Sequence, residues 1–208
     1  MKRVEELVTR RLLLRPFRAA DLQDLYDCLS DPEVVRFEPY PPATWAKAEA
    51  ALRERMAGGD MLAVERREDG RVIGNVCLGG REFEALELGY LLRRDCWRRG
   101  YALEACRALV EEAFSRGAHR IYAECDPQNA ASWRLLERLG FRREAHFRKN
   151  VYFWKDTAGC PCWKDTYVYG LLREDAAELC LEEKFDLEAR SQTAEAGPVS
   201  GALCEGDM

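Results

Sequence analysis

The short basic turn Arg98-Arg99-Gly100 is the part of this sequence whose residue types and spacing point most directly to chemistry. An apolar segment, residues 86–92, leads into the turn, and an amphipathic helical pattern follows it. The first backbone N–H groups of a helix have no intrahelical acceptor, and the helix dipole makes that end positive. Gly100 permits close approach of the backbone, and the two arginines add charge. The turn therefore predicts an anion site suited to a pyrophosphate.

The elements that position this turn follow from hydrophobic periodicity, from capping residues and from turn residues. Thr44 suits the N-cap of a helix, and Glu68-Asp69-Gly70-Arg71 suits a hairpin turn. The expected strands are 11–17, 61–65, 71–78, 86–92, 120–125, 141–154 and 163–172. The expected helices are 22–29, 44–56, 100–116, 129–139 and 174–183.

This order of strands and helices predicts an α/β (α+β) fold, with a mixed sheet and helices on both faces. The 208 residues suit one domain with a full core. Residues 174–190 are expected to form a helical extension. The composition from about Ser191 onward is rich in Ala, Gly, Ser and Glu, so residues 191–208 are expected to be a disordered acidic tail.

Composition and charge exclude several classes of protein. The formal net charge is −5, and the acidic excess lies in residues 173–208, so nothing resembles a nucleic-acid-binding stripe. No apolar run reaches the roughly 18 residues that span a bilayer, and the N-terminus lacks the apolar region of a secretory signal. The nine cysteines are scattered through apolar segments, which indicates reduced thiols and a cytoplasmic protein.

Cys160-Pro161-Cys162 is interpreted as a loop feature, because a lone C-x-C in a chain with two histidines does not supply a four-ligand zinc site. The sequence therefore predicts no metal centre. His146 is an alternative base on the segment after Phe141, although a structural histidine explains it as well.

Several further segments match one known pattern in order and spacing. They are Thr9–Phe17, Leu29–Glu33, Glu87–Tyr90 with Trp97–Ala105, Asp126–Ser132 with Leu139–Phe141, and Tyr167–Arg173. On these segments the chain, over residues 8–173, resembles the GCN5-related N-acetyltransferase (GNAT) superfamily. The closer likeness is to the branch of ribosomal-protein N-terminal acetyltransferases (RimJ/RimL-like).

The resemblance implies a single-domain GNAT fold with a mostly antiparallel sheet that splays where strand 86–92 parts from strand 120–125. It implies acetyl-CoA as co-substrate, with the pantetheine arm along the exposed strand edge and the pyrophosphate on the basic turn. The implied cofactor-binding residues are Leu88, Gly89, Tyr90, Trp97, Arg98, Arg99, Gly100, Tyr101, Ala102 and Asn129.

The same resemblance implies two catalytic residues. Glu87 would lie beside the thioester, where a carboxylate can act as a base toward the acceptor amine, although it could equally be a solvated strand residue. Ser132 would supply a proton or hydrogen bond to the departing thiolate, and its alternative is a plain helix-surface serine. Many superfamily members have a tyrosine for this role four residues later, and here that residue is Leu136. Asn129 also suits a simple N-cap.

The acceptor is expected to be a primary amine, namely the N-terminal α-amine of a protein or peptide, because the neutral form of an α-amine costs about 3 kcal/mol less to reach at neutral pH than that of a lysine. The open alternatives are a small-molecule amine, such as an aminoglycoside or polyamine, and a non-catalytic CoA-binding module. Both a monomer and a homodimer are compatible with the sequence, and no nucleic-acid or membrane partner is expected. Phe37, Tyr40 and Trp154 are expected to wall the acceptor site, although aromatic residues there are equally suited to a core.

Overall fold

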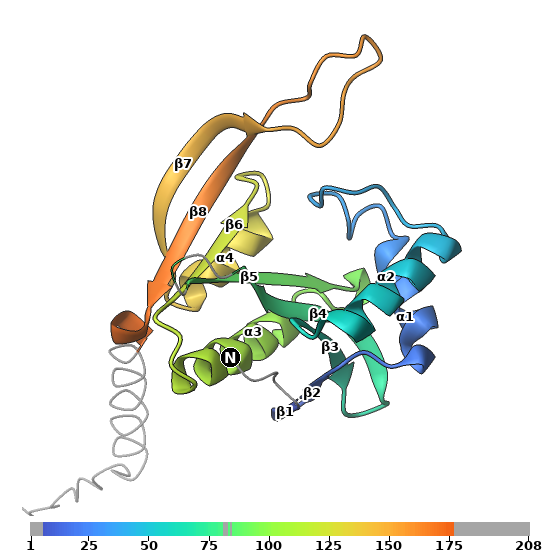
Figure 1. Ribbon diagram of the computed structural model, residues 1–208, viewed down its shortest axis with the longest axis vertical. Helices are drawn as coiled ribbons and strands as arrows, with labels where there is room; N and C mark the ends of the chain where they lie inside the picture. The colour runs from blue at the N-terminus through green and yellow to red at the C-terminus, as the bar shows by residue number, and fades with distance from the viewer. Residues whose placement is uncertain (1–5, 81–82, 84, 177–208) are drawn as a thin grey trace, which may run out of the picture. The chain divides into compact units, whose positions relative to one another are not determined.

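A computed structural model describes residues 6–80, 83 and 85–176 of the chain (Figure 1). By its internal packing the chain divides into two units, Met1–Arg173 and Glu174–Met208, and each is considered by itself. Only Glu174–Ala176 of the second unit are described. The rest of the predicted helical extension (174–190) and the whole predicted tail (191–208) lie outside the described residues and stay predictions.

The first unit alternates strands and helices largely as expected. The strands are β1 (Leu7–Val8), β2 (Leu12–Arg15), β3 (Met61–Arg66), β4 (Arg71–Gly79), β5 (Ala85–Leu92), β6 (Arg120–Cys125), β7 (Arg142–Val151) and β8 (Lys164–Leu172). The helices are α1 (Leu22–Leu29), α2 (Trp45–Gly58), α3 (Tyr101–Ser115) and α4 (Ala130–Arg138), with short 3-10 turns η1 (Ala19–Asp21) and η3 (Arg94–Cys96). No helix in the described ranges is long and apolar enough to cross a bilayer.

The described strands form one eight-stranded sheet in the order β1-β2-β3-β4-β5-β6-β8-β7. All neighbours are antiparallel except β5 and β6, which are parallel and are joined through α3. Helices α1 and α2 lie on one face of the sheet and α3 on the other (Figure 1). The predicted mixed, mostly antiparallel sheet flanked by helices is therefore confirmed.

The α1 face of the sheet carries a core that fixes both N-terminal helices. Leu25, Cys28 and Leu29 of α1 are buried, and they pack in one cluster with side chains of α2, the sheet and neighbouring loops. The other buried members are Phe17, Val34, Val35, Leu52, Ala63, Val72 and Leu91. Their removal from water is the main force that holds α1 and α2 against the sheet.

The boundaries differ from expectation at the N-terminal strand, which was predicted over 11–17. It runs from Leu12 to Arg15, because Pro16 has no N–H to donate and Arg15 turns its guanidinium inward. Arg15 is 3 % exposed, and its Nη1 lies 2.8 Å from Asp21 Oδ2 while its Nε lies 2.6 Å from Glu65 Oε2. These carboxylates satisfy a buried charge and raise the pKa of Arg15. The short strand β1 was missed.

Candidate active site

The site begins where β5 and β6 separate. The two strands pair only at Ala85, Leu86 and Glu87, opposite Arg120, Ile121 and Tyr122. Beyond Glu87, β5 keeps its partner β4, whereas the rest of β6 pairs with β8 on its other side. Figure 1 shows β5 and β6 diverging from this point. The β5 edge from Leu88 to Leu92 consequently presents backbone donors and acceptors that no strand takes up, as an extended ligand requires.

The basic turn after β5 has the backbone of an anion site. Arg98 and Gly100 both lie in the left-handed region, with φ of 58° and 78°, whereas the intervening Arg99 does not. Two left-handed residues this close together can turn neighbouring N–H groups toward one concavity. The first backbone bond of α3 runs from Glu104 N to Gly100 O, so the preceding amides of Tyr101, Ala102 and Leu103 have no intrahelical acceptor. The sequence identified Gly100 but not the strained conformation of Arg98.

Trp97 fixes the turn to the end of β5. Its indole Nε1 donates to Leu92 O at 2.8 Å, while the side chain stays 43 % exposed. The side chains of Arg98 and Arg99 are exposed, whereas Tyr101, the first residue of α3, is buried. The predicted cofactor residues Trp97 to Ala102 therefore connect the end of β5 to the start of α3.

Glu104, one turn into α3, clamps the basic turn to the connection between β1 and β2. Its carboxylate accepts hydrogen bonds from Thr9 Oγ1 at 2.6 Å, from Arg11 N at 2.8 Å and from Arg11 Nε at 2.6 Å. Arg11 also donates through Nη1 to Arg99 O at 2.9 Å and lies over the ring of Tyr101, 4.5 Å from its centroid. Although burial acts in the opposite direction, these hydrogen bonds hold the pKa of Glu104 below its usual value. The clamp had no recognisable sequence signal, because its members are far apart in the chain.

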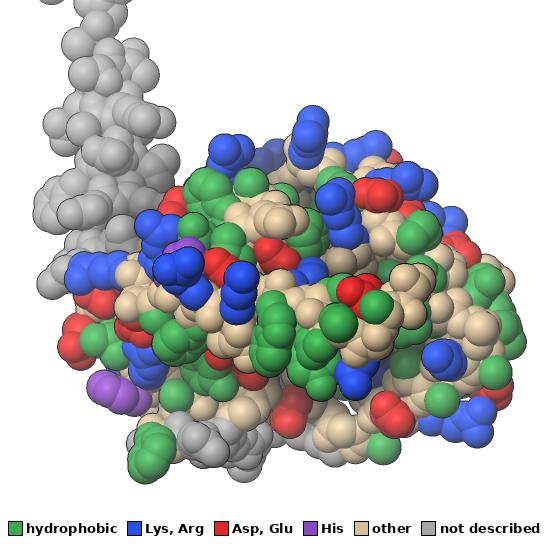
Figure 2. Space-filling model, turned by 90° about the horizontal axis from the view of Figure 1, so that it is seen from above, with side chains coloured by type: hydrophobic (Ala, Val, Ile, Leu, Met, Phe, Trp, Pro, Cys, Tyr) green, Lys and Arg blue, Asp and Glu red, His purple; other side chains and the backbone are tan. Residues whose placement is uncertain are grey.

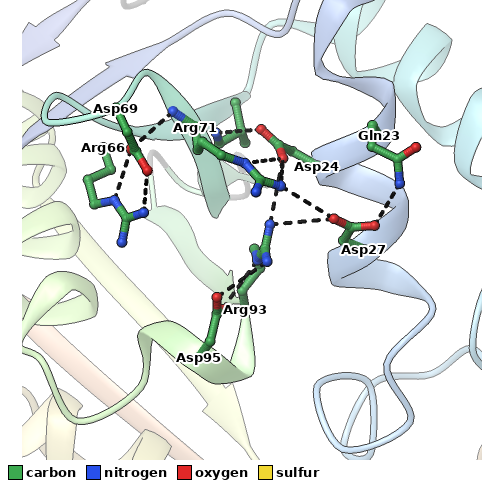
Figure 3. Close-up of polar contacts among 9 residues, drawn as sticks. Gln23, Asp24, Asp27, Arg66, Asp69, Arg71, Arg93 and Asp95 are labelled. Atoms are coloured by element: carbon green, nitrogen blue, oxygen red, sulfur yellow. Dashed lines mark hydrogen bonds and ion pairs between the residues drawn. The ribbon is translucent and has the colours of Figure 1, made fainter.

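A second polar network ties α1 to β4 and to the segment that leaves β5. Figure 3 shows Asp24 and Asp27 of α1 facing Arg71 and Arg93. The Asp24 carboxylate also accepts from Val72 N at 2.9 Å. The segment between β5 and the basic turn is therefore held in place by polar contacts on both faces of the sheet.

Glu87 lies at the branch point of the splay. Its side chain is exposed, and Tyr122 on β6 donates to its Oε2 at 3.4 Å. Glu124, two residues further along β6, has a pKa raised by burial and by the charge of Glu87. Two carboxylates thus face the opening, and the sequence analysis identified only the first. The signal for Glu124 was its position on the same strand face as Tyr122.

Asn129 and Ser132 lie at the start of α4, across the opening. Asn129 Oδ1 accepts from Ser132 N at 3.2 Å, so the N-cap interpretation is confirmed, and the cofactor role stays a prediction. Ser132 Oγ lies 2.7 Å from Tyr90 Oη, and Tyr90 Oη also donates to Ser132 O at 3.2 Å. Burial raises the pKa of Tyr90, which keeps the phenol protonated. Ser132 is therefore part of a hydroxyl pair and not an isolated helix-surface serine.

Cys125 completes this group. Burial raises the pKa of its thiol to about 11, although its contact with Ser132 acts in the opposite direction. A thiol with so high a pKa carries little thiolate at neutral pH and is a poor nucleophile.

The predicted acceptor-wall aromatics are distributed over two loops. Phe37 and Tyr40 lie in the α1–α2 loop, and Lys164 Nζ of β8 lies 5.6 Å from the ring of Phe37 and 5.7 Å from that of Phe153. Trp154 is 37 % exposed and packs edge-on to Phe153 at 6.4 Å. The structure thus brings Phe37 toward the β7–β8 loop through Lys164. The sequence analysis missed Phe153 and Lys164.

The end of the molecule where both loops lie presents hydrophobic side chains in the middle of the face, with basic and acidic side chains around them (Figure 2). Tyr40 also lines a cavity of about 440 Å³ beneath the α1–α2 loop.

The remaining candidates belong to the β7–β8 hairpin. His146 Nε2 lies 2.8 Å from Asp165 Oδ2, and its ring packs edge-on to Tyr167 at 4.9 Å. These contacts support the structural interpretation of His146. Cys160 and Cys162 are exposed and free. Among the residues that the structure describes, no group of three or more His, Cys, Asp or Glu is arranged to hold a metal ion.

Comparisons with known proteins agree with this geometry. Residues 11–142 match the model of the acetyltransferase (GNAT) domain. The uncharacterised N-acetyltransferase YnaD of Bacillus subtilis (strain 168) is 30 % identical over 172 residues, covering 81 % of this chain and 98 % of its own.

Solved structures give the same result. The crystal structure of a GNAT-family acetyltransferase from Bacillus anthracis matches with a TM-score of 0.74 and 28 % identity, over 81 % of this chain and 99 % of its own. A Vibrio cholerae protein provisionally assigned as a ribosomal-protein-serine acetyltransferase matches with a TM-score of 0.65 and 26 % identity, over 83 % of this chain and 99 % of its own.

Glu104→Gln is expected to lower the free energy of unfolding by about 1 kcal/mol at neutral pH, because it weakens charge-assisted hydrogen bonds at a partly exposed clamp. The folded-state pKa of Glu104 lies below the ordinary value of about 4.3, so the stabilisation by its carboxylate is present above that value. It is lost as the pH falls through the folded-state pKa. Urea unfolding from about pH 7 to about pH 3 should therefore show the two proteins converging at the acid end.

The control is Glu111→Gln, an exposed carboxylate on the same helix, which should match the wild type throughout. A difference between the wild type and Glu104→Gln that stays constant over the whole pH range would contradict the role of the Glu104 charge.

Proposed function

Because the chain belongs to the GNAT family of N-acetyltransferases, we propose that it moves the acetyl group of acetyl-CoA directly to a primary amine, the N-terminal α-amine of a protein or peptide. The observation that carries the proposal is the β5 edge that β6 leaves unpaired, which leads from Glu87, where the two strands part, to the basic turn.

The residues present fit acetyl-CoA. The left-handed Arg98 and Gly100 and the N-terminal amides of α3 suit a pyrophosphate, and the β5 edge suits the amide-containing pantetheine arm. The proposed binding residues are Leu88, Gly89, Tyr90, Trp97, Arg98, Arg99, Gly100, Tyr101, Ala102 and Asn129. Bound there, acetyl-CoA supplies an activated acetyl thioester.

Glu87 accepts, directly or through water, the proton that the acceptor amine must lose before it can attack. The backbone N–H groups between Leu88 and Tyr90 offer donors to an oxygen that gains negative charge. Ser132 Oγ donates a hydrogen bond to a departing thiolate, and Tyr90, whose Oη lies 2.7 Å behind it, orients this hydroxyl. The high pKa of Cys125 supports direct transfer without a covalent acetyl-enzyme.

An N-terminal α-amine is the acceptor that this machinery suits best. Its pKa is about 8 against about 10.4 for lysine, which favours the α-amine by about 3 kcal/mol at neutral pH. The likeness to a protein provisionally assigned as a ribosomal-protein-serine acetyltransferase supports the same class. Phe37, Tyr40 and Trp154 are proposed to line the acceptor site.

A small-molecule amine, such as an aminoglycoside or polyamine, is the second candidate. The cavity beside Tyr40 is lined by Glu54 and Asp60, which favour a cation, but also by Lys47 and Arg55, which oppose one. The presence of Glu87, Asn129 and Ser132 around one opening argues against a non-catalytic CoA-binding module.

Acetyl-CoA is expected to raise the melting temperature, since a ligand at 100 times its Kd stabilises the folded state by about 2.7 kcal/mol. The paired change Arg98→Gln and Arg99→Gln should reduce that shift, because it removes charge at the pyrophosphate. Arg10→Gln with Arg53→Gln removes two exposed arginines elsewhere and should retain it. No shift in the wild type at millimolar acetyl-CoA would contradict the cofactor assignment.

Thiol release from acetyl-CoA should be fastest with peptides that have a free N-terminal amine. The panel comprises such peptides, the same peptides with a blocked N-terminus and an internal lysine, a polyamine and an aminoglycoside. Faster release with the polyamine or the aminoglycoside would replace the proposed acceptor by the second candidate.

Glu87→Gln should lower kcat by about 100-fold, because the amine loses its base. Ser132→Ala should lower kcat by about 10-fold, because the thiolate loses one charge-assisted hydrogen bond. Both variants should keep the melting shift with acetyl-CoA, and Glu68→Gln, an exposed residue of the β3–β4 turn, serves as the control. Rates like the wild type in both variants would remove Glu87 and Ser132 from the mechanism.

A further inference from the structure

The cavity beneath the α1–α2 loop has a volume of about 440 Å³, enough for an amino-acid-sized group. The last turns of α2, the α1–α2 loop and the first residue of β3 form its walls. The lining residues that differ most in chemistry are Tyr40, Lys47, Glu54, Arg55, Asp60 and Met61.

Arg55 is the unusual residue in this lining. Its Nη1 is buried and has no hydrogen-bond partner, which within the described residues is true of only one other buried side-chain atom, Asn75 Oδ1. The guanidinium packs against Phe17, with Cζ 5.4 Å from the ring centroid. Burial lowers the pKa of Arg55, yet a guanidinium stays charged at neutral pH. Arg55 as a whole is only partly buried and lines the cavity, so an anionic oxygen of a ligand bound there can pair with its charge.

Glu38, the carboxylate whose charge acts on Arg55, has a different partner. Burial raises the pKa of Glu38, and Tyr40 donates a hydrogen bond to its carboxylate, which acts in the opposite direction. No carboxylate in the described part of the chain forms an ion pair with Arg55. The Arg55 charge therefore remains available to a ligand.

The cavity lies within reach of the proposed reaction centre. Met61 in its wall pairs with Cys77 on β4, and Cys77 pairs with Gly89 on β5, two residues beyond Glu87. Neighbouring strands are about 4.8 Å apart, so the cavity wall is about 10 Å from β5. Gly89 leaves room for the Cys77 side chain, since a Cβ there would lie 2.8 Å from Sγ. An extended acceptor of two residues spans about 7 Å, and side chains cover the remainder.

We propose that Arg55 binds a carboxylate of the acceptor, so that the preferred substrates are amines that carry an acidic group within about two residues of the reacting nitrogen. This inference rests on the proposed N-terminal acetyl transfer and specifies its substrate class. Glu54 and Asp60 in the same lining disfavour a doubly charged phosphate more than a singly charged carboxylate. The carboxylate can come from an Asp or Glu side chain near a peptide N-terminus or from the α-carboxylate of a free amino acid.

The test compares acceptors in isosteric pairs, measured by thiol release. Peptides with Asp or Glu at the first or second position are compared with peptides carrying Asn or Gln there, and free amino acids with their amides. The wild type should favour the acid of each pair by about 10-fold or more in kcat/KM, the size expected for a hydrogen bond to a charged group. A larger preference among the peptides identifies an Asp or Glu side chain as the source of the carboxylate, and a larger preference among the free amino acids identifies the α-carboxylate.

Arg55→Gln should abolish this preference by lowering kcat/KM for acidic acceptors while changing the amide acceptors less than about 3-fold. Arg55→Lys should restore part of it. Arg53→Gln, an exposed residue on the same helix that pairs with Glu49, should keep the full preference. Equal rates for acid and amide in the wild type, or an equal loss for both in Arg55→Gln, would overturn the proposal.

Binding without acetyl-CoA gives a readout independent of turnover. Calorimetry with the acidic and the amide peptide should show tighter binding of the acid by the wild type and none of this difference in Arg55→Gln. If no amine releases thiol but the acidic peptide binds through Arg55, the proposed function fails and the carboxylate site stands. If peptides are acetylated without regard to charge, the proposed function stands and the carboxylate site fails.

Discussion

The parting of β5 from β6 after Glu87 is the constraint on which the rest of the structure depends. A parallel pair inside a sheet normally continues hydrogen-bonding along its length, and here it stops after three residues because β6 follows β8 while β5 follows β4. On an outer strand of the sheet, an unpaired edge of this kind would favour pairing with other chains and aggregation. In the middle of the sheet, the unpaired β5 edge borders a slot between β5 and β6. Glu87 lies at one end of this slot and the basic turn at the other. The proposed cofactor site and the proposed catalytic residues all lie around this single interruption of the hydrogen-bonded ladder.

Two sets of charges hold the slot open in a defined geometry. On one face of the sheet, Glu104 joins α3 to Thr9 and Arg11 between β1 and β2. On the other face, Asp24 and Asp27 hold α1 against Arg71 and Arg93. Both sets act on the segment between β5 and α3, so the position of the basic turn does not depend on its own few contacts. Preorganised backbone donors of this kind bind an anion without first having to be ordered.

Much of this arrangement could be predicted from the sequence. Hydrophobic periodicity predicted the helices, turn residues predicted the hairpin, and Gly100 after an apolar segment predicted an anion site. These features could be predicted because each depends on residues that are adjacent in the sequence. The left-handed Arg98, the pairing of Tyr90 with Ser132, and Glu124 beside Glu87 could not be predicted. Each depends on register between segments distant in the chain, and on which way a side chain turns once that register is set. The partly buried position of Arg55 could not be predicted either, since an arginine near the end of a helix normally faces water.

The Glu104 clamp also bears on the order in which the chain can fold. Arg11 and Glu104 are 93 positions apart in the sequence. Thr9 and Arg11 can therefore form their hydrogen bonds to the Glu104 carboxylate only after α3 has been synthesised. The parallel pairing of β5 with β6 comes later still, since it needs the whole crossover through α3. Contacts of such sequence separation carry a large loop-closure cost and slow folding. The basic turn consequently gains its clamp only after α3 has been synthesised, and the β5 edge is left without its β6 partner until the crossover is complete.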